Sequence, residues 1–235
     1  KDAASVILTD DNFATIVKSI TNGRNIYSNI KNSIKFLLSG NMSGILSVLY
    51  ASIFALPAPF APVHLLFINL ITDSLPAIAI GMEKSKKDVL KDKPRNAKES
   101  ILTKDFIISI TLQGLVIGLF TMIAYHIGLS KGSVGTAMTM AFATLCIARL
   151  FHGFNCRGKK SIFSLGLFSN KFSWMAFGIG IVLVNAVLLV PGLQALFEVT
   201  PLALNDIVTI HILAFMPTVA IQLTKLIREF VEKRK

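Results

Sequence analysis

Apolar residues fill six long segments of the chain, each about 20 residues long or slightly longer. A helix of that length crosses the hydrocarbon core of a bilayer, which is about 30 Å thick. The segments are residues 36–55, 62–82, 105–128, 134–154, 172–192 and 205–227. A soluble domain of this size would carry more than the 16% of charged residues found here. The pattern therefore predicts an all-α membrane protein with six transmembrane helices.

The polar segment ahead of the first span has one apolar face. Asp11 or Asn12 is a suitable helix N-cap. Apolar residues then recur at helical spacing at Ile16, Ile20, Ile26, Ile30 and Ile34. We expect a stalk helix that continues without a break into the first span. The predicted domains are residues 1–35, which end in the stalk, and the membrane domain 36–235.

Lysine and arginine give the chain a formal net charge of +11, and they gather in the loops on one side of the spans. The basic stretches are 83–104, 155–171 and the C-terminal tail, whereas the opposite loops 56–61, 129–133 and 193–204 together hold only Lys131. By the positive-inside rule, both termini are expected in the cytoplasm. Because the charges flank apolar spans, we expect the lipid bilayer as a partner and no nucleic acid. The 83–104 loop either sets the orientation alone or also forms a docking surface for a cytoplasmic domain.

Three polar side chains interrupt the second apolar segment, at Asn69, Thr72 and Asp73. Their spacing of i, i+3 and i+4 places them on one face of a helix. A charged residue at the bilayer centre costs roughly 2.5–3.5 kcal/mol on insertion scales and usually marks an ion pathway. Pro76 cannot bond to the carbonyl of Thr72, so that oxygen is released beside the side chains. We interpret this segment as a broken helix, unwound near residues 72–76, that binds a cation. The alternative is a proline kink with a partnered Asp73.

Two more polar residues lie within other spans. Asn41 stands among small residues of the first span, where its amide is either a second ligand or an interhelical hydrogen-bond partner. Arg149 lies in the fourth span, near its basic end. Its guanidinium either pairs with Asp73 inside the bundle or snorkels to the interface. We favour the buried position.

Other conspicuous residues are assigned to packing. Gly114 and Gly118 form a Gly-x-x-x-Gly step, which is typical of close helix contact, here predicted against the first span. Cys146 and Cys156 show no metal-ligand spacing. The sequence contains no Gly-rich phosphate loop and no hydrolase or metalloprotease motif, so we predict no catalytic residue within it.

Several motifs resemble the cation-pumping P-type ATPases, and the resemblance extends over essentially the whole chain. Residues 1–13 and 23–31 look like the end of that family's phosphorylation domain and its stalk. Residues 69–77 look like the sixth of its ten spans, in the calcium-pump branch. Residues 197–202, with Asn205 and Asp206, resemble the start of its last span.

The resemblance implies the fifth to tenth spans of an ATP-driven calcium export pump, in a bacterial-type plasma membrane. The phosphorylation, nucleotide-binding and actuator domains and the first four spans would then lie upstream and act as partners. They would bind Mg²⁺ and ATP, and this fragment alone would be inactive. The rival interpretations are the same fold pumping another cation such as Mn²⁺, or a stand-alone channel or structural membrane protein. The stalk sequence argues against a channel.

The resemblance also implies roles for individual residues. Asn69, Thr72 and Asp73 match the family's sixth-span calcium ligands, and Asn41 matches its fifth-span asparagine. Gly44 stands where two-ion members carry a glutamate, and Arg149 replaces a second acidic ligand with a cation. Ca²⁺ requires about 6–8 oxygen ligands including carboxylates, so these departures favour one calcium per cycle. Gly44, Pro76 and Arg149 are therefore expected to shape the site.

Overall fold

The computed structural model describes residues 7, 12–84, 90 and 100–234, so most of the basic 83–104 loop lies outside the described residues. Its helices are α1 (Phe13–Ile53), α2 (Pro62–Phe67), the π-helix η1 (Ile68–Asp73), α3 (Ser74–Gly81), α4 (Lys104–Ser130), α5 (Val134–Asn155), α6 (Ile162–Leu165), α7 (Lys171–Leu189), α8 (Pro191–Leu196) and α9 (Leu204–Arg234). Among the described residues, 6 helical stretches are long and apolar enough to cross a membrane, with α2, η1 and α3 forming one of them. The predicted all-α, six-span fold is confirmed.

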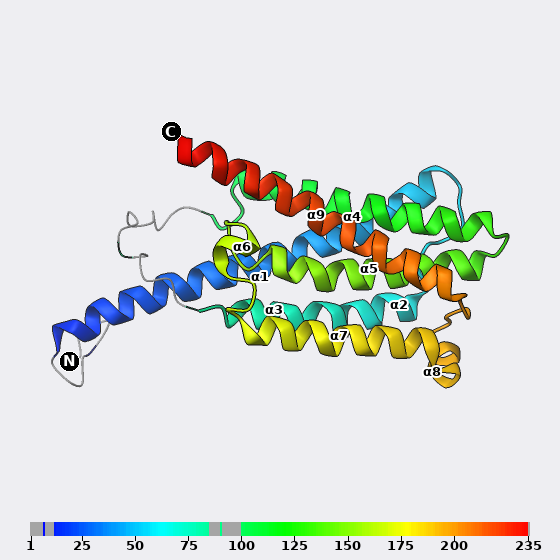
Figure 1. Cartoon of the computed structure of the whole chain (residues 1–235), viewed down its shortest axis with the longest axis horizontal. Coiled ribbons are helices and arrows are strands. Elements are labelled where there is room, and N and C mark those ends of the chain that lie inside the picture. Colours follow the sequence, from blue (N-terminus) through cyan, green and yellow to red (C-terminus); the bar gives the residue numbers. More distant parts are fainter. Residues whose placement is uncertain (1–6, 8–11, 85–89, 91–99, 235) are drawn as a thin grey trace.

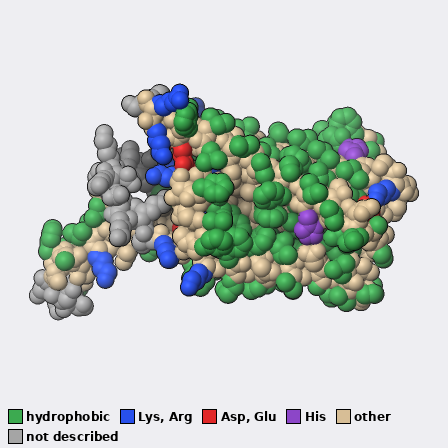
Figure 2. Space-filling model, in the orientation of Figure 1, with side chains coloured by type: hydrophobic (Ala, Val, Ile, Leu, Met, Phe, Trp, Pro, Cys, Tyr) green, Lys and Arg blue, Asp and Glu red, His purple; other side chains and the backbone are tan. Residues whose placement is uncertain are grey.

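The long helices lie side by side in one elongated bundle (Figure 1). The start of α1 and the end of α9 lie at one end of it, with α6, and we call this the basic end. The turn between α4 and α5 lies at the opposite end, with α8. Hydrophobic side chains cover much of the bundle's surface, and blue lysine and arginine side chains gather near the basic end (Figure 2). This distribution suits a bundle whose middle lies in lipid.

The stalk and the first span form a single helix, α1, of 41 residues. The side chain of Asn12 caps it by accepting a hydrogen bond from the backbone N–H of Ala14 at 3.0 Å. At 1.5 Å per residue the helix is about 60 Å long, roughly twice the thickness of the hydrocarbon core. The N-terminal part of α1 therefore extends beyond the bundle, as expected of a continuous stalk (Figure 1).

The second span is broken, but not at the predicted place. We expected unwinding near residues 72–76, whereas the wide π-helical turns of η1 end at Asp73 and a regular helix resumes at Ser74. Pro76 removes the N–H that would bond to the carbonyl of Thr72. The helix widens in the turns before Pro76 and is not interrupted there, because a π-bulge lies inside an otherwise regular helix. The Ser74 hydroxyl donates to the carbonyl of Asn69 at 3.2 Å across the widened turn.

Helix α5 forms the centre of the bundle and packs against α4, α7 and α9. Its residues from Thr139 to Leu150 are all buried. Two glycines on neighbouring helices permit this close packing: a side chain at Gly128 would collide with Ala137, and one at Gly180 would collide with Leu150. Cys146 and Cys156 are buried and free, in agreement with a packing role.

The Gly-x-x-x-Gly step packs against α1 as predicted. A Cβ atom at Gly114 would lie 2.8 Å from Cβ of Met42 and 2.9 Å from the carbonyl oxygen of Ser39. At Gly118 it would lie 3.2 Å from the carbonyl oxygen of Ser43. The two helices approach so closely that only glycine fits at Gly114 without a shift of the backbone or of Met42.

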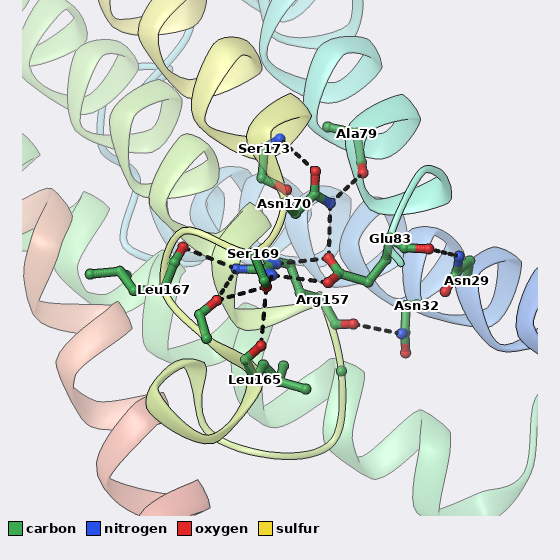
Figure 3. Close-up of polar contacts among 12 residues, drawn as sticks. Asn29, Asn32, Ala79, Glu83, Arg157, Leu165, Leu167, Ser169, Asn170 and Ser173 are labelled. Carbon is green, nitrogen blue, oxygen red and sulfur yellow. Dashed lines mark hydrogen bonds and ion pairs between the residues drawn. The ribbon is translucent and has the colours of Figure 1, made fainter. Parts of the chain in front are cut away.

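A buried polar junction closes the basic end of the bundle (Figure 3). Arg157, which is 0% exposed, donates from Nε and Nη2 to the carboxylate of Glu83 at 2.8 and 2.9 Å. Asn170 at the start of α7 donates to the same carboxylate at 2.8 Å. From the stalk, Asn32 donates to the Arg157 carbonyl at 3.1 Å and Asn29 to the Glu83 carbonyl at 3.0 Å. The junction therefore ties α1, the end of α3 and the α5–α7 connection together.

Candidate ion-binding site

A buried ion pair joins three spans in the interior of the bundle. Asp73, the last residue of η1, is 5% exposed, and Arg149 of α5 is 2% exposed. Nη2 of Arg149 lies 2.7 Å from Oδ1 of Asp73 and donates a hydrogen bond to Oδ2 at 2.8 Å. The same nitrogen donates to Oδ1 of Asn41, on α1, at 2.9 Å. Of the two positions considered for Arg149, the structure has the buried one, paired with Asp73.

A glycine makes room for the guanidinium, but it is Gly40 and not Gly44. A Cβ atom at Gly40 would lie 2.5 Å from both Nε and Nη2 of Arg149, whereas one at Gly44 would have no atom within 4 Å. Helix α1 therefore presents bare backbone to the guanidinium one turn away from the expected residue. Arg149 does not lie within 4 Å of a Cβ atom at Gly44, so Gly44 does not make room for the guanidinium as the site-shaping role expected of it would require.

The pair is electrostatically compensated inside the apolar bundle. Two unit charges about 4 Å apart attract by roughly 4 kcal/mol at an effective dielectric constant of about 20. The amide oxygen of Asn41 adds a third acceptor close to the guanidinium. Nε of Arg149 has no hydrogen-bond partner within the described part of the chain, so its solvation is incomplete. A cation that entered beside Asp73 would have to compete with the guanidinium for the carboxylate.

The other two predicted ligands are placed differently. Thr72 is 0% exposed, and its hydroxyl donates to the carbonyl of Ile68 on its own helix at 3.0 Å. Asn69 lies on the exposed face of the helix, one wide turn before Asp73. Asn41 is likewise an exposed residue, although its amide oxygen reaches Arg149. The structure thus brings Asp73, Arg149 and Asn41 together and leaves Asn69 and Thr72 outside this cluster.

The cluster is not a complete metal site. In the residues that the structure describes, no three His, Cys, Asp or Glu side chains are grouped to hold a metal ion. The oxygen donors of the cluster are the carboxylate of Asp73 and the amide oxygen of Asn41, which are hard ligands of the kind that Ca²⁺ and Mn²⁺ accept. A full shell around Asp73 would need oxygen ligands beyond these side chains.

Known proteins identify the family. Residues 57–227 match the family described as "Cation transporting ATPase, C-terminus". The chain is 39% identical to "Calcium-transporting ATPase 1" of Bacillus cereus over 97% of its length, and 39% identical to "Calcium-transporting ATPase" of Bacillus subtilis over 93%. It is 34% identical to "Calcium-transporting ATPase type 2C member 1" of Mus musculus over 88%.

The chain belongs to the cation-transporting P-type ATPases. It forms the membrane-embedded C-terminal part of such an ATPase. It spans about a quarter of the length of the curated relatives that it matches, with 28%, 25% and 23% of those three proteins covered. The sequence resemblance to this family is therefore confirmed.

Two residues near the ion pair of this ATPase part were missed by sequence reasoning. Gly40 stood among several small residues, and nothing in the sequence distinguished it as the one that faces Arg149. His152 was given no role, yet it is 0% exposed and shares a 2.8 Å hydrogen bond with the hydroxyl of Ser39. This bond connects α5 to α1 close to Arg149 and helps to fix the register of the two helices.

Proposed function

We propose that this chain is the ion-binding membrane part of an ATP-driven calcium export pump. The proposal is supported by the calcium-transporting names of its relatives, by the six-span fold and by a buried carboxylate in a broken span. The rest of the pump would bind ATP and Mg²⁺ and carry out the phosphorylation. The clustering of lysine and arginine at one end of the bundle supports an orientation with both termini in the cytoplasm. The Bacillus relatives support a bacterial plasma membrane.

The main observation behind the proposal is that one nitrogen of Arg149, Nη2, contacts both the carboxylate of Asp73 and the amide oxygen of Asn41. We propose that Ca²⁺, the transported ion, replaces this nitrogen and binds Asp73 and Asn41. Asn69 and Thr72 would be the other calcium ligands that this chain provides. Ca²⁺ takes about 6–8 oxygen ligands, so further ligands would come from the spans outside this chain. A second calcium would lack a carboxylate of its own and would face the guanidinium, which supports one ion per cycle.

The same geometry gives Arg149 a role in the return step. With calcium released, Asp73 would be left as an unpaired buried anion, and an uncompensated buried charge is strongly destabilising. The guanidinium removes this penalty without the import of another cation. Arg149 would thus serve as a built-in counter-charge.

The stalk is positioned to drive the exchange between the two states. The hydroxyl of Ser33 on α1 donates to the carbonyl of Ala77 on α3 at 2.9 Å. Asn29, one turn earlier on α1, donates to the carbonyl of Gly81 at 3.2 Å. A displacement of α1 along its axis would therefore pull on α3, which follows Asp73 directly. The π-helical turns of η1 are the part of this span that could absorb the movement.

The test is the ratio of calcium ions transported to ATP hydrolysed by the intact pump that contains this chain, reconstituted in vesicles. We expect a ratio of one, and a ratio of two would contradict the single-site proposal. Asp73→Asn should abolish calcium-dependent phosphorylation from ATP while the protein remains inserted, and Glu232→Gln, on the exposed end of α9, should not. Activation by Mn²⁺ and not by Ca²⁺ would assign the pump to another ion.

A further inference from the structure

A groove at the basic end of the bundle is lined by cationic, polar and apolar side chains, a combination that suits a phospholipid. It lies between α1, α4, α9 and the loop after α5, and its volume is about 560 Å³. Its cationic lining consists of Lys35, Lys159, Lys225 and Arg228, with Asp105 as the acidic residue among the lining groups. We call this space the basic groove. It is separate from the Asp73–Arg149 pair and has no part in the proposed transport site.

Among the described residues, none of the four cations of the basic groove forms an ion pair with a protein carboxylate. In the described part of the chain, no carboxylate lies within the 4.0 Å limit of an ion pair with Lys35, Lys159 or Arg228. Lys225 donates to the carbonyl oxygens of Asn155 and Gly158 at 2.5 and 2.7 Å, which fix its position but leave its charge in place. Lys35 on α1 is half-buried, and burying an unpaired ammonium is costly, so an anionic partner would stabilise it.

Along α4 the lining carries polar and apolar side chains at the same heights. Ser109 and Gln113 are the polar residues, and Oε1 of Gln113 is buried without a hydrogen-bond partner in the described residues. Ile108, Leu112 and Val116 of the same helix form the apolar wall. From Ile108 to Val116 this wall extends about 12 Å along the helix axis. Ile108 and Leu112 are 56% and 58% exposed, so the wall faces outward, where hydrocarbon would surround the bundle.

The geometry points to a binding site for one anionic phospholipid in the leaflet at the basic end. The phosphate would lie among Lys35, Lys159 and Arg228, the glycerol esters near Ser109, and an acyl chain farther along α4 against Leu112 and Val116. A soluble phosphate or an acidic peptide could use the cations but would gain nothing from the outward apolar wall. Since the lipid would contact the stalk at Lys35 and the last span at Arg228, it would also tie these two elements together.

The experiment measures lipid retained by the intact protein that contains this chain, by native mass spectrometry with palmitoyl-oleoyl phosphatidylglycerol or phosphatidylcholine added. We expect preferential retention of phosphatidylglycerol. Lys159→Gln and Arg228→Gln should each weaken it about fivefold, the effect expected of one basic residue near an anionic lipid surface. Lys233→Gln is the matched control, because Lys233 is exposed on the same helix as Arg228 but lies outside the groove. Lys159→Arg, which keeps the charge, should bind like the unaltered protein.

Three outcomes would overturn the proposal. Equal retention of the two lipids would show that the groove does not select an anionic headgroup. An equal loss in Lys233→Gln would show a general surface charge effect, and displacement of the lipid by inorganic phosphate would identify a free-phosphate site. Lys159 and Arg228 are both exposed, so we expect the variants to fold, and their thermal unfolding without added lipid checks this. None of these readouts depends on calcium transport.

Discussion

The pairing of Asp73 with Arg149 makes a quantitative prediction for a double-mutant cycle. In Asp73→Asn a buried guanidinium loses its counter-charge, and in Arg149→Met a buried carboxylate does. Each side chain is almost fully buried, at 5% and 2% exposure, so solvent cannot replace the missing partner. Breaking a buried pair by removing one member costs about 3–5 kcal/mol, whereas replacing both members with neutral groups is often neutral. We expect the double variant to be more stable than either single variant.

The coupling energy follows from the geometry. Nη2 lies 2.7 and 2.8 Å from the two carboxylate oxygens, so the charge centres are about 4 Å apart. At an effective dielectric constant of about 20 this gives roughly 4 kcal/mol of attraction. The sum of the two single effects should exceed the effect of the double variant by at least this amount, because each single variant also leaves one buried charge uncompensated.

The assay is thermal unfolding of the intact pump in detergent with a calcium chelator present. Lys131 and Asp206 provide a matched control cycle, because they also form an ion pair but the Lys131 side chain is 43% exposed. Asp206 is buried, but solvent reaches Lys131, so we expect a weaker coupling of about 1 kcal/mol or less. The measurements are then repeated with calcium, which should stabilise Arg149→Met more than the unaltered protein, since the ion returns a counter-charge to Asp73.

Additive effects of Asp73→Asn and Arg149→Met would refute the reasoning, because they would show that the two charges do not stabilise each other. If calcium stabilised Arg149→Met and the unaltered protein equally, the charge pair would still be supported. Calcium binding at Asp73 would be refuted. The two parts of the argument can therefore fail separately.

Two further predictions concern the surroundings of the pair and the basic end. Gly40→Ala places a methyl group 2.5 Å from the guanidinium and should lower stability by about 1–3 kcal/mol, as overpacking does. Gly44→Ala meets no atom within 4 Å and should be nearly neutral. The unfolding midpoints of the two variants test this, and equal midpoints would contradict it. Glu83→Gln leaves Arg157 buried without its carboxylate and should cost about 3 kcal/mol in the same assay, against less than about 0.5 kcal/mol for the exposed Glu232→Gln. Nη1 of Arg157 also donates to the carbonyls of Gly166 and Leu167, and a Glu83→Gln variant as stable as this control would show that these two bonds suffice.

The spans and the stalk could be predicted because they depend on local sequence. In lipid every backbone polar group must be bonded within its own helix, so a long apolar run has essentially one available conformation. The predicted segment 134–154 became α5, Val134–Asn155, and 105–128 became α4, Lys104–Ser130. The cap at Asn12 and the proline-linked break in the second span also follow from neighbouring residues, although the break lies at 68–73 and not at 72–76.

The contacts of the candidate site needed the tertiary structure. Asp73 and Asn41 are 76 and 108 positions away from Arg149 in the sequence, and the choice between a paired and a snorkelling guanidinium depended on how α1, η1 and α5 pack. The same holds for Gly40, and for Arg157, whose charge the sequence could assign only to orientation. Hydropathy measures whether a side chain prefers water or hydrocarbon, and this preference identifies the membrane-spanning helices. It carries no information on which side chain fills the space between two helices, because that is decided by the shapes and rotations of both.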